Sequence, residues 1–406
     1  MMRVLLLTDE DITHGADGYR VRVLSELTEA TKRGIHFTVL SFQHMRHLSS
    51  FAGALEYSRL IRSLGCDVIV VWVFPHFSNR LLFRLVRSYK AFWLKRILKG
   101  FHVKLIHCHS CPEVAHLALM SKTHHHLPIV FDLHGAPEER SFLYHTRSKS
   151  IAEEAERVDK QVLRSAEAVV CVSSSLSRHV QTKFFARRTL VIPCAVDTRL
   201  FRFSSAHRDR LRSQWNLKDD QPVFVYSGGT QTYQQLDVMA RLFREILGFL
   251  PSSKVLLLVP TSSRDAVEEM FRLAGVPSES LIVCSTDHWR VPAFLSAADI
   301  AFLIRENLLI NRVASPTKFA EYLACGLPVV ASPYVDSVRD AIRQGGVGFL
   351  LQGQIEDSIQ QLSDFTKSVI TNRAEWSKKC QMYARDYLSW DYYGDELVKL
   401  YASVNA

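Results

Sequence analysis

Short apolar runs recur along the chain and alternate with longer stretches in which apolar residues recur every three or four positions. In the first half, the apolar runs cover residues 3–8, 36–42, 67–74, 104–110, 128–135, 168–174 and 189–196. Runs that are apolar throughout are typical of strands buried on both faces. Because these runs alternate with helical stretches of about ten residues or more, the pattern predicts a mostly parallel sheet with crossover helices.

The same pattern begins again in the second half, after a charged stretch at residues 208–221. Its apolar runs cover residues 222–229, 254–260, 280–286, 299–304 and 328–332. Two doubly wound α/β domains joined near residues 196–215 explain this repetition better than one large sheet. Residues 390–404 have the pattern of an aromatic-rich amphipathic helix, and the pattern leaves the packing partner of that helix open.

Composition narrows the class of protein. The chain has 406 residues, 47% hydrophobic and 22% charged, which suits a globular protein with two cores. The longest apolar run, residues 68–74, is too short to span a membrane, and the N-terminus lacks the apolar region of a signal peptide. We therefore expect a cytoplasmic protein. The apolar surroundings of four cysteines predict buried thiols rather than disulfides, namely at Cys171, Cys194, Cys284 and Cys325.

The net charge of +9 comes from residues 1–200, whereas the second half is nearly balanced. Residues 68–112 contain no acid, and helical spacing places Arg80, Arg84 and Arg87 on one face, with aromatic residues nearby. This composition suits peripheral contact with an anionic membrane surface. A packed helix with a solvated basic side is the alternative. No nucleic-acid-binding motif is present, so nucleic acid is not an expected partner.

Residues 315–332 combine a helix signal with two charges. Ser315 suits the N-cap and Pro316 the first helical position, so a helix is expected from here to about Cys325. Lys318 then lies in the first turn, where a cation is unfavourable unless an anion binds nearby. Glu321, one turn later, could accept hydrogen bonds from the hydroxyls of a ribose. A solvated ion pair between the two side chains is the alternative.

Topology favours the binding site. In doubly wound sheets, ligands lie outside the carboxyl ends of the strands, and two such domains can face each other across a cleft. Small and polar residues follow the predicted strands at these ends, namely Gly15, Asp17, Gly18, His134, Gly135, Ser173, Gly228, Gly229, Thr230, residues 285–288 and Arg305. A phosphate-bearing ligand is therefore expected in the cleft.

Several segments, in this order, resemble one known family: AEAVVCVSSSLSRHV, TLVIPCAVDTRLF, PVFVYSGGT, VPAFLSAADIAFLI and SPTKFAEYLACGLPVVAS. The chain resembles the retaining family-4 glycosyltransferases of GT-B fold that assemble bacterial surface polysaccharides. The resemblance implies transfer of a sugar from a nucleotide-sugar to a glycan or lipid-linked acceptor, without a metal or other cofactor. It also implies that residues 1–196 and about 386–406 form the acceptor-side domain, and that residues 197–385 form the donor domain.

The resemblance assigns roles to particular residues. Glu321 matches the second Glu of the family's E-x7-E element, which holds the ribose, whereas the first Glu falls on Val313, so Asn311 or Arg312 would replace it. The loop after Gly229 lacks the usual diphosphate-binding cations, which leaves Lys318 and Arg305 to take that role. The implied donor-binding set is Gly15, Gly18, Gly228, Gly229, Thr230, Thr286, His288, Asn311, Ser315, Pro316, Thr317 and Glu321.

His134 follows a strand where the family often has a histidine near the donor sugar, and we expect it to be catalytic together with Arg305 and Lys318. Glu138 would face the acceptor, with a solvated turn as an equal alternative. Retaining relatives are thought to let the acceptor attack from the face of the leaving group, whose phosphate takes the proton.

Two short motifs suggest metals. Residues 9–11 read D-x-D, but they lack the strand context of a metal-dependent glycosyltransferase. Residues 107–111, HCHSC, suggest zinc, but a single Cys-x-x-Cys is weak and favours a structural role. No metal is therefore expected. Two other functions remain open: a nucleotide-sugar epimerase of GT-B fold, and a non-catalytic binding subunit.

Overall fold

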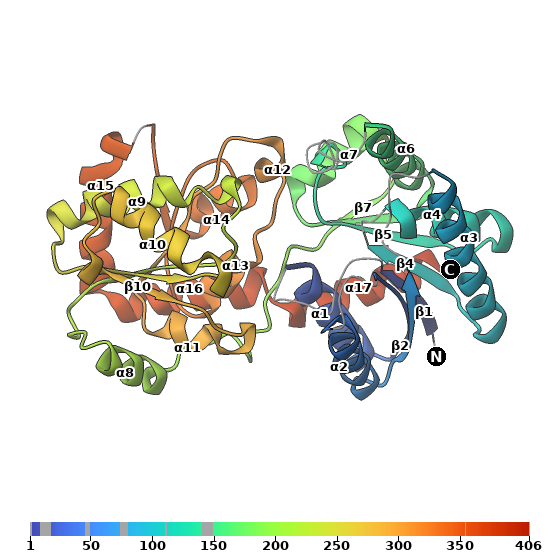
Figure 1. Ribbon diagram of the computed structural model, residues 1–406, viewed down its shortest axis with the longest axis horizontal. Helices are drawn as coiled ribbons and strands as arrows, with labels where there is room; N and C mark the ends of the chain where they lie inside the picture. Colours follow the sequence, from blue (N-terminus) through green and yellow to red (C-terminus); the bar gives the residue numbers. More distant parts are fainter. Residues whose placement is uncertain are drawn as a thin grey trace. The chain divides into compact units, whose positions relative to one another are not determined.

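The computed structural model describes residues 2–8, 18–44, 49–73, 80–109, 112–139, 149–353 and 355–405. The chain forms two compact units (Figure 1). The first consists of Met1–Pro193 and Trp390–Ala406, and the second of Cys194–Ser389. The apolar runs had indicated a junction near residues 196–215, and the family resemblance had implied boundaries at residue 196 and near residue 386.

The first unit is built on a parallel sheet of seven described strands in the order β3-β2-β1-β4-β5-β6-β7. Apolar runs form these strands because both faces of the sheet are covered, and Val4 to Leu7 have no exposed surface. The strands are β1 (Met2–Thr8), β2 (Ile35–His44), β3 (Asp67–Val73), β4 (Leu105–His109), β5 (Ile129–Leu133), β6 (Ala168–Cys171) and β7 (Thr189–Val191).

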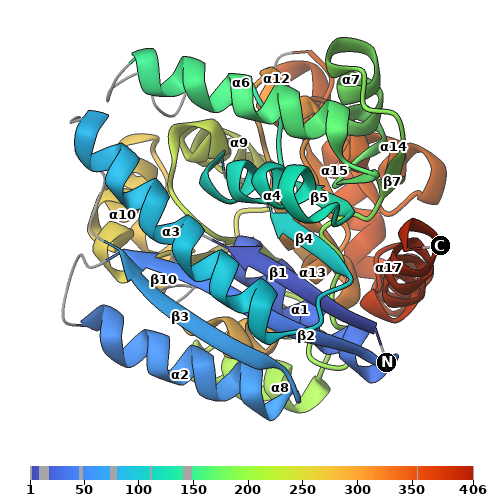
Figure 2. The same cartoon turned by 90° about the vertical axis from the view of Figure 1, so that its right-hand side faces the viewer.

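Helices cover both faces of this sheet (Figure 2). One face carries α1 (Gly18–Lys32), α2 (Ser49–Ser63) and α17 (Trp390–Val404). The other carries α3 (Arg80–Gly100), α4 (Pro112–His125), α6 (Lys149–Ser165) and α7 (Ser174–Phe184). The change of face follows the strand order, because the chain winds outward from β1 to β3 and then crosses to β4.

Helix α17 belongs to the first unit although it is the last element of the chain. Its bounds, Trp390–Val404, are those that the sequence pattern predicted. It lies against α1, where Arg33 Nη2 donates to the Asp391 carbonyl at 2.6 Å and Arg33 Nε lies 2.5 Å from Asp395 Oδ1. The buried side chain of Tyr401 reaches the sheet, where its hydroxyl is hydrogen-bonded to His107 on β4.

The second unit has a parallel sheet of six strands in the order β10-β9-β8-β11-β12-β13. These are β8 (Val223–Ser227), β9 (Lys254–Leu258), β10 (Leu281–Cys284), β11 (Ile300–Leu303), β12 (Val329–Ala331) and β13 (Gly348–Leu350). The sequence predicted the first five but not β13, because a three-residue strand that contains a glycine has no apolar run of its own.

Two apolar cores lie on opposite faces of this second sheet. One is formed with α9 (Leu236–Phe249), α10 (Arg264–Leu273) and α15 (Ile355–Thr371). The other is formed with α11 (Val291–Ser296), α13 (Thr317–Ala324), α14 (Asp336–Gly345) and α16 (Arg373–Tyr387). The remaining described α-helices of this unit are α8 (Ser205–Gln214) and α12 (Leu309–Arg312). The prediction of two doubly wound α/β domains is therefore confirmed.

Two further expectations from the sequence concern the cysteines and membrane-spanning helices. The seven described cysteines all carry free thiols; Cys171 and Cys325 are buried, whereas Cys194 and Cys284 are only partly buried. None of the described helices combines the length and the apolar character that crossing a bilayer requires.

Candidate donor site and buried polar cluster

The candidate donor site lies where β8 and β11 are adjacent in the second sheet. From β8 the strand order runs outward to β9 and β10, and from β11 it runs the other way to β12 and β13, so this is a switch point. Gly228 directly follows β8, and Arg305 comes two residues after the end of β11. Helix α13, which carries Lys318 and Glu321, follows β11 in the chain and packs on the same sheet.

Lys318 is held above the end of β8 by polar and aromatic contacts. Its Nζ donates to the Tyr226 hydroxyl at 3.0 Å and to Gln234 Oε1 at 3.1 Å, and it lies 4.1 Å from the centre of the Tyr226 ring. Burial and the neighbouring Arg305 hold the pKa of Lys318 well below its usual value, although Glu321 opposes this shift. Lys318 forms no ion pair with any carboxylate in the described part of the chain. A bound anion would offset the cost of burying the protonated ammonium, so the site is suited to an anion.

Gly228 leaves the space that Lys318 needs. Its φ of +140° is one that side chains rarely tolerate, and a β-carbon built there would lie 2.5 Å from Lys318 Nζ. The next residue, Gly229, accepts a hydrogen bond of 2.5 Å from the Tyr226 hydroxyl. Gly228 thus brings backbone, rather than a side chain, close to the lysine.

Arg305 is the second cation of this site and is 9% exposed. Its guanidinium lies 5.0 Å from the centre of the Tyr233 ring, and burial lowers its pKa, although nearby tyrosines oppose the shift. No ion pair joins it to a carboxylate among the described residues. Ser332 fixes its backbone, because the Ser332 hydroxyl accepts from the Arg305 amide and donates to its carbonyl, both at 2.9 Å. Arg305 and Ser332 line a cavity of about 690 Å³.

Glu321 faces a different partner from Lys318. Its Oε1 lies 2.7 Å from His288 Nε2, and its side chain is buried. The interpretation of Lys318 and Glu321 as a solvated ion pair is therefore wrong, because each side chain is held by other residues. The sequence had named His288 as a donor-site residue, and the structure brings it to Glu321 across 33 positions of the chain.

The start of α13 differs from the sequence prediction. The helix begins at Thr317 with Pro316 at the N-cap, and no side chain caps it. Ser315 is not the N-cap, because its hydroxyl accepts a hydrogen bond of 3.0 Å from the Cys194 amide instead. Lys318 therefore lies at the second helical position, beside an uncapped N-terminus, where the helix dipole favours a negatively charged ligand.

The other predicted donor residues are dispersed around this edge. Thr230 lies after β8 and bonds to the Ser263 hydroxyl at 3.1 Å, and Thr286 follows β10 two residues before His288. Asn311 is buried with its amide donating to the Glu306 carbonyl at 2.9 Å. Val313, in the place of the missing Glu, is buried, and Arg312 is exposed.

In the first unit, His134 lies directly after β5 with its side chain 19% exposed. Its Nε2 lies 3.0 Å from His109 Nδ1 and 3.4 Å from Asp132 Oδ1. Gly18 is the first residue of α1. Gly15, Asp17 and the D-x-D triplet at residues 9–11 lie outside the described residues.

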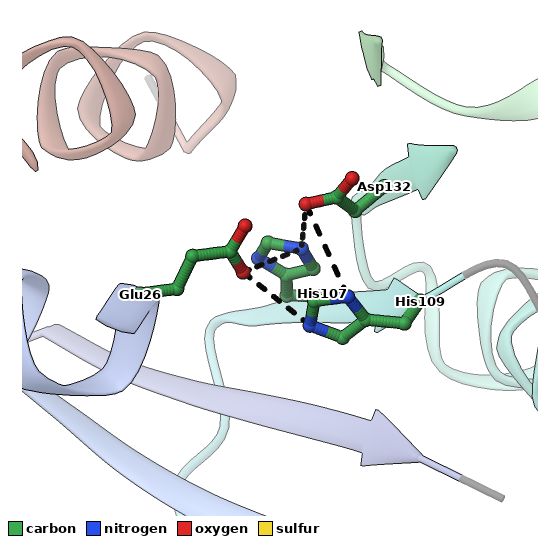
Figure 3. A group of neighbouring side chains, drawn as sticks. All are labelled: Glu26, His107, His109 and Asp132. Atoms are coloured by element: carbon green, nitrogen blue, oxygen red, sulfur yellow. Dashed lines mark ion pairs between the residues drawn. The ribbon is translucent and has the colours of Figure 1, made fainter. Parts of the chain in front are cut away.

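A fully buried polar cluster lies behind His134 and is drawn in Figure 3. It consists of Glu26 from α1, His107 and His109 from β4 and Asp132 from β5, and none of the four has exposed surface. The Arg22 guanidinium lies 2.9 Å from Asp132 Oδ2 and 3.1 Å from Glu26 Oε1.

The charges of this cluster are set by burial and by Arg22. Burial raises the pKa of the Asp132 carboxyl, but Arg22 and His134 more than offset it and hold the pKa well below the usual value. Burial also lowers the pKa of His109 well below its usual value. Sequence reasoning missed Glu26 and Arg22, since nothing in a helix pattern indicates that charged residues face the core. The signal that the sequence offered for this cluster was the H-x-H spacing of His107 and His109, which places both side chains on one face of a predicted strand.

The predicted acceptor and membrane residues have mixed environments. Glu138 Oε1 lies 2.9 Å from His179 Nε2 and also contacts Lys183. On α3, Arg84 is exposed, whereas Arg87 turns inward to Glu113 and Glu154, 3.5 Å from each. Arg87 therefore does not share the exposed face, because helical spacing cannot reveal carboxylates on other helices. The side chain of Arg80 lies outside the described residues.

Two family models match the chain. Residues 16–200 match the model described as Glycosyltransferase Family 4, and residues 207–387 match Glycosyl transferases group 1. A D-inositol 3-phosphate glycosyltransferase of Rhodococcus opacus is 24% identical over 257 residues, which cover 61% of this chain. That match spans 56% of the relative's own length.

Two solved structures resemble the whole chain. Sucrose-phosphate synthase of Thermosynechococcus elongatus has a TM-score of 0.75 at 16% identity and covers 100% of this chain and 99% of its own. Anabaena HepE in complex with UDP has a TM-score of 0.70 at 16% identity, and the match covers 99% of this chain and 100% of that chain. The resemblance to family-4, group 1 glycosyltransferases of GT-B fold is confirmed. The chain belongs to the family-4, group 1 glycosyltransferases and has their GT-B architecture of two Rossmann-like domains.

Proposed function

We propose that this enzyme transfers a sugar, with retention, from a nucleotide-sugar to a glycan or lipid-linked acceptor in polysaccharide or glycolipid assembly, without a metal in the reaction. The observation that carries the donor part is the pair of cations at the switch point of the second unit. Lys318 and Arg305 are both withdrawn from water, and neither forms an ion pair among the described residues. The diphosphate of a sugar nucleotide supplies the missing negative charge. HepE, which shares the fold, was crystallised with UDP.

The donor is held in two parts. The diphosphate lies at the uncapped N-terminus of α13, against Lys318 and Arg305, where the backbone of Gly228 allows close approach. The ribose hydroxyls lie against Glu321, whose orientation is fixed by His288. Since Glu321 follows Lys318 by nearly one helical turn, one rigid helix aligns both parts of the nucleotide.

The chemistry follows from the position of the cations. When the bond from the anomeric carbon to the phosphate oxygen breaks, negative charge grows on the diphosphate. Two prepositioned cations and helix amides stabilise that charge more strongly than water does, because they need no reorganisation. In the proposed reaction His134 contacts the donor sugar and Glu138 the acceptor, whose hydroxyl proton passes to the departing phosphate.

The membrane part of the proposal rests on α3. Its exposed side combines cations with large apolar side chains, a composition that favours the interface of an anionic membrane. We define this α3 surface as Arg84, Leu85, Tyr89, Phe92, Lys95, Arg96 and Lys99. Contact with the inner face of the cytoplasmic membrane would bring the enzyme to a lipid-linked acceptor.

Calorimetric titration with nucleosides and their mono- and diphosphates tests the donor site. Titrations with UDP, GDP, ADP, CMP and their nucleotide-sugars identify the preferred base. The variants Lys318→Met and Glu321→Gln then separate the contribution of the diphosphate from that of the ribose. We expect Lys318→Met to lose most of the affinity that the diphosphate adds, and Glu321→Gln to weaken even the nucleoside. Lys254→Met is the matched control, because its ammonium contacts only a carbonyl elsewhere in the unit. If no nucleotide binds, or both variants bind as the wild type does, the site is wrong.

A second measurement tests the reaction. The bound nucleotide-sugar is incubated with and without membrane extracts that contain lipid-linked acceptors, and the products are examined by NMR. Transfer requires the acceptor, and retention requires that the anomeric configuration of the donor persist in the product. Interconversion of the donor sugar without any acceptor would indicate an epimerase instead.

A further inference from the structure

The buried cluster of the first unit is a second candidate site, separate from the donor residues. Glu26, His107, His109 and Asp132 offer one ligand atom each within 4.8 Å of one another. All four residues are completely buried. We propose that they bind a divalent transition-metal ion, with zinc as the reference case, in a structural role.

The two histidines point toward one place. His107 Nε2 lies 3.8 Å and His109 Nε2 lies 3.3 Å from the same atom, Glu26 Oε2 (Figure 3). Asp132 Oδ2 lies 3.7 Å from His107 Nε2 and completes the set. Ligands of a tetrahedral zinc ion with bonds of about 2.0–2.1 Å are separated by about 3.4 Å, so small side-chain shifts would close this arrangement around an ion.

The other ring nitrogens of both histidines are already engaged. His107 Nδ1 is hydrogen-bonded to the Tyr401 hydroxyl of α17, and His109 Nδ1 lies 3.0 Å from His134 Nε2. When each Nδ1 carries the proton and donates it, each Nε2 presents a lone pair to the cluster. Hydrogen bonds of this kind orient most metal-binding histidines in proteins.

The nearest acidic neighbours of the two Nε2 atoms are carboxylate oxygens of Glu26 and Asp132. Each Nε2 atom is buried, and neither has a hydrogen-bond partner among the described residues. A lone pair on His109 Nε2 that faces a carboxylate oxygen at 3.3 Å without an intervening proton or cation would be repelled by it. A metal ion between the two atoms turns this repulsion into coordination, and imidazole with carboxylate is a common ligand set for zinc, iron and manganese.

Local structure explains why these residues meet. His107 and His109 lie two positions apart on β4 and therefore on the same face of the sheet, whereas Cys108 points to the opposite face. Strand register pairs His109 with Asp132 on β5. Arg22 Nε lies near Glu26 Oε1, which leaves Oε2 of that carboxylate toward the histidines. The four proposed ligand atoms include no cysteine of the HCHSC motif, and Cys111 lies outside the described residues.

The test measures metal content in the full chain, purified through a tag without histidine. We expect about one equivalent of zinc, iron or manganese per chain by mass spectrometry after dialysis. The variants His107→Gln, His109→Gln and Glu26→Gln should retain less than about a tenth of it. His36→Gln should retain all of it, because His36 pairs with Asp67 on the edge strand of the same unit. After chelation, adding Zn²⁺ should raise the Tm of the wild type and of His36→Gln only.

Two outcomes would overturn the proposal. The first is a wild type that contains no metal and shows neither a Tm shift with Zn²⁺ nor the visible absorption of tetrahedral Co²⁺; this outcome needs no variant, so it holds even if the substitutions prevent folding. The second is undiminished metal in His109→Gln, which would place the ion elsewhere, for example at the adjacent histidines 124–126. Because metal content is read without substrate, failure here leaves the proposed transferase activity untouched.

Discussion

A β-carbon at Gly228 would lie 2.5 Å from Nζ of Lys318, so the glycine and the lysine occupy one space that a larger residue cannot share. Gly228→Ala should therefore displace the ammonium and weaken nucleotide diphosphate binding at least tenfold, while the positive φ costs about 1–3 kcal/mol of stability. Calorimetry and urea unfolding measure the two effects. Gly34→Ala has a positive φ but no atom within 4 Å, so it isolates the backbone cost. Unchanged nucleotide affinity in Gly228→Ala would contradict the assignment of Lys318.

The pKa of Lys318 predicts a pH dependence of nucleotide binding. Burial and Arg305 lower this pKa in the free protein, and a bound diphosphate raises it again. Binding should then take up a proton at pH values between the lowered pKa of the free protein and the raised pKa of the complex, and affinity should fall as pH rises through that interval. Calorimetry in buffers of different ionisation enthalpy measures the uptake. Lys318→Met should show none, and equal uptake in both proteins would exclude the lysine as its source.

The same shift predicts the sign of a stability effect. Because the pKa of Lys318 is lower in the folded chain than in the unfolded chain, folding must bury a charge at low pH but not at high pH. Lys318→Met should therefore stabilise the free protein most at pH values below the folded pKa of Lys318. The gain should shrink as pH rises from the folded pKa toward about 10.5, the unfolded value. Urea unfolding midpoints of the wild type and of Lys318→Met across this pH range measure the gain. A gain that grows with pH would contradict the lowered pKa of Lys318.

Arg22 should be among the residues on which the first unit depends most. Its guanidinium neutralises Glu26 and Asp132 and donates to the carbonyls of Ile192 and Pro193, each at 3.0 Å. Arg22→Met leaves the carboxylates buried without this partner and should cost about 3–5 kcal/mol in urea unfolding. The control is Arg33→Met, a partly exposed arginine directly after the end of the same helix, which should cost about 1 kcal/mol or less. Equal losses of unfolding free energy in Arg22→Met and Arg33→Met would contradict the claim that the burial of Arg22 makes it more important to stability.

Gly348 should tolerate no side chain. A β-carbon there would lie 2.1 Å from the Val329 carbonyl oxygen, because β13 approaches β12 closely. Gly348→Ala should cost about 1–3 kcal/mol or separate the edge strand, as urea unfolding and amide exchange in β13 can measure. By contrast, Gly248→Ala lies in helix α9 with nothing within 4 Å and should stabilise by up to about 1 kcal/mol. A neutral Gly348→Ala would disprove the close strand contact.

Charge reversal on the α3 surface tests the membrane proposal. Arg84→Glu with Lys95→Glu should lower partitioning onto liposomes of anionic lipid by about 2 kcal/mol or more, roughly thirtyfold, because each cation near such a surface contributes about 1 kcal/mol. Flotation measures this. Arg385→Glu with Lys399→Glu reverses two exposed charges on other helices and should float as the wild type does. Equal flotation of the two double variants would remove the α3 surface from the proposal.

The amino-acid sequence determined the elements and their order. Apolar runs marked twelve of the thirteen strands of the two sheets to within a few residues, and the pattern of residues 390–404 gave the bounds of α17. These features are local, since a strand buried on both faces or an amphipathic helix imposes its period on adjacent residues. The family also followed from contiguous segments, and it is confirmed.

Only the tertiary structure decided which side chains meet. Ser315 bonds to Cys194 rather than capping α13, Lys318 and Glu321 have separate partners, and Arg87 turns inward. The same holds for Glu26, more than 80 positions before His109 and yet 3.3 Å from it. Such pairings depend on strand order and register, which adjacent residues do not encode. The sequence therefore established a glycosyltransferase fold, whereas burial and side-chain geometry located its two polar centres.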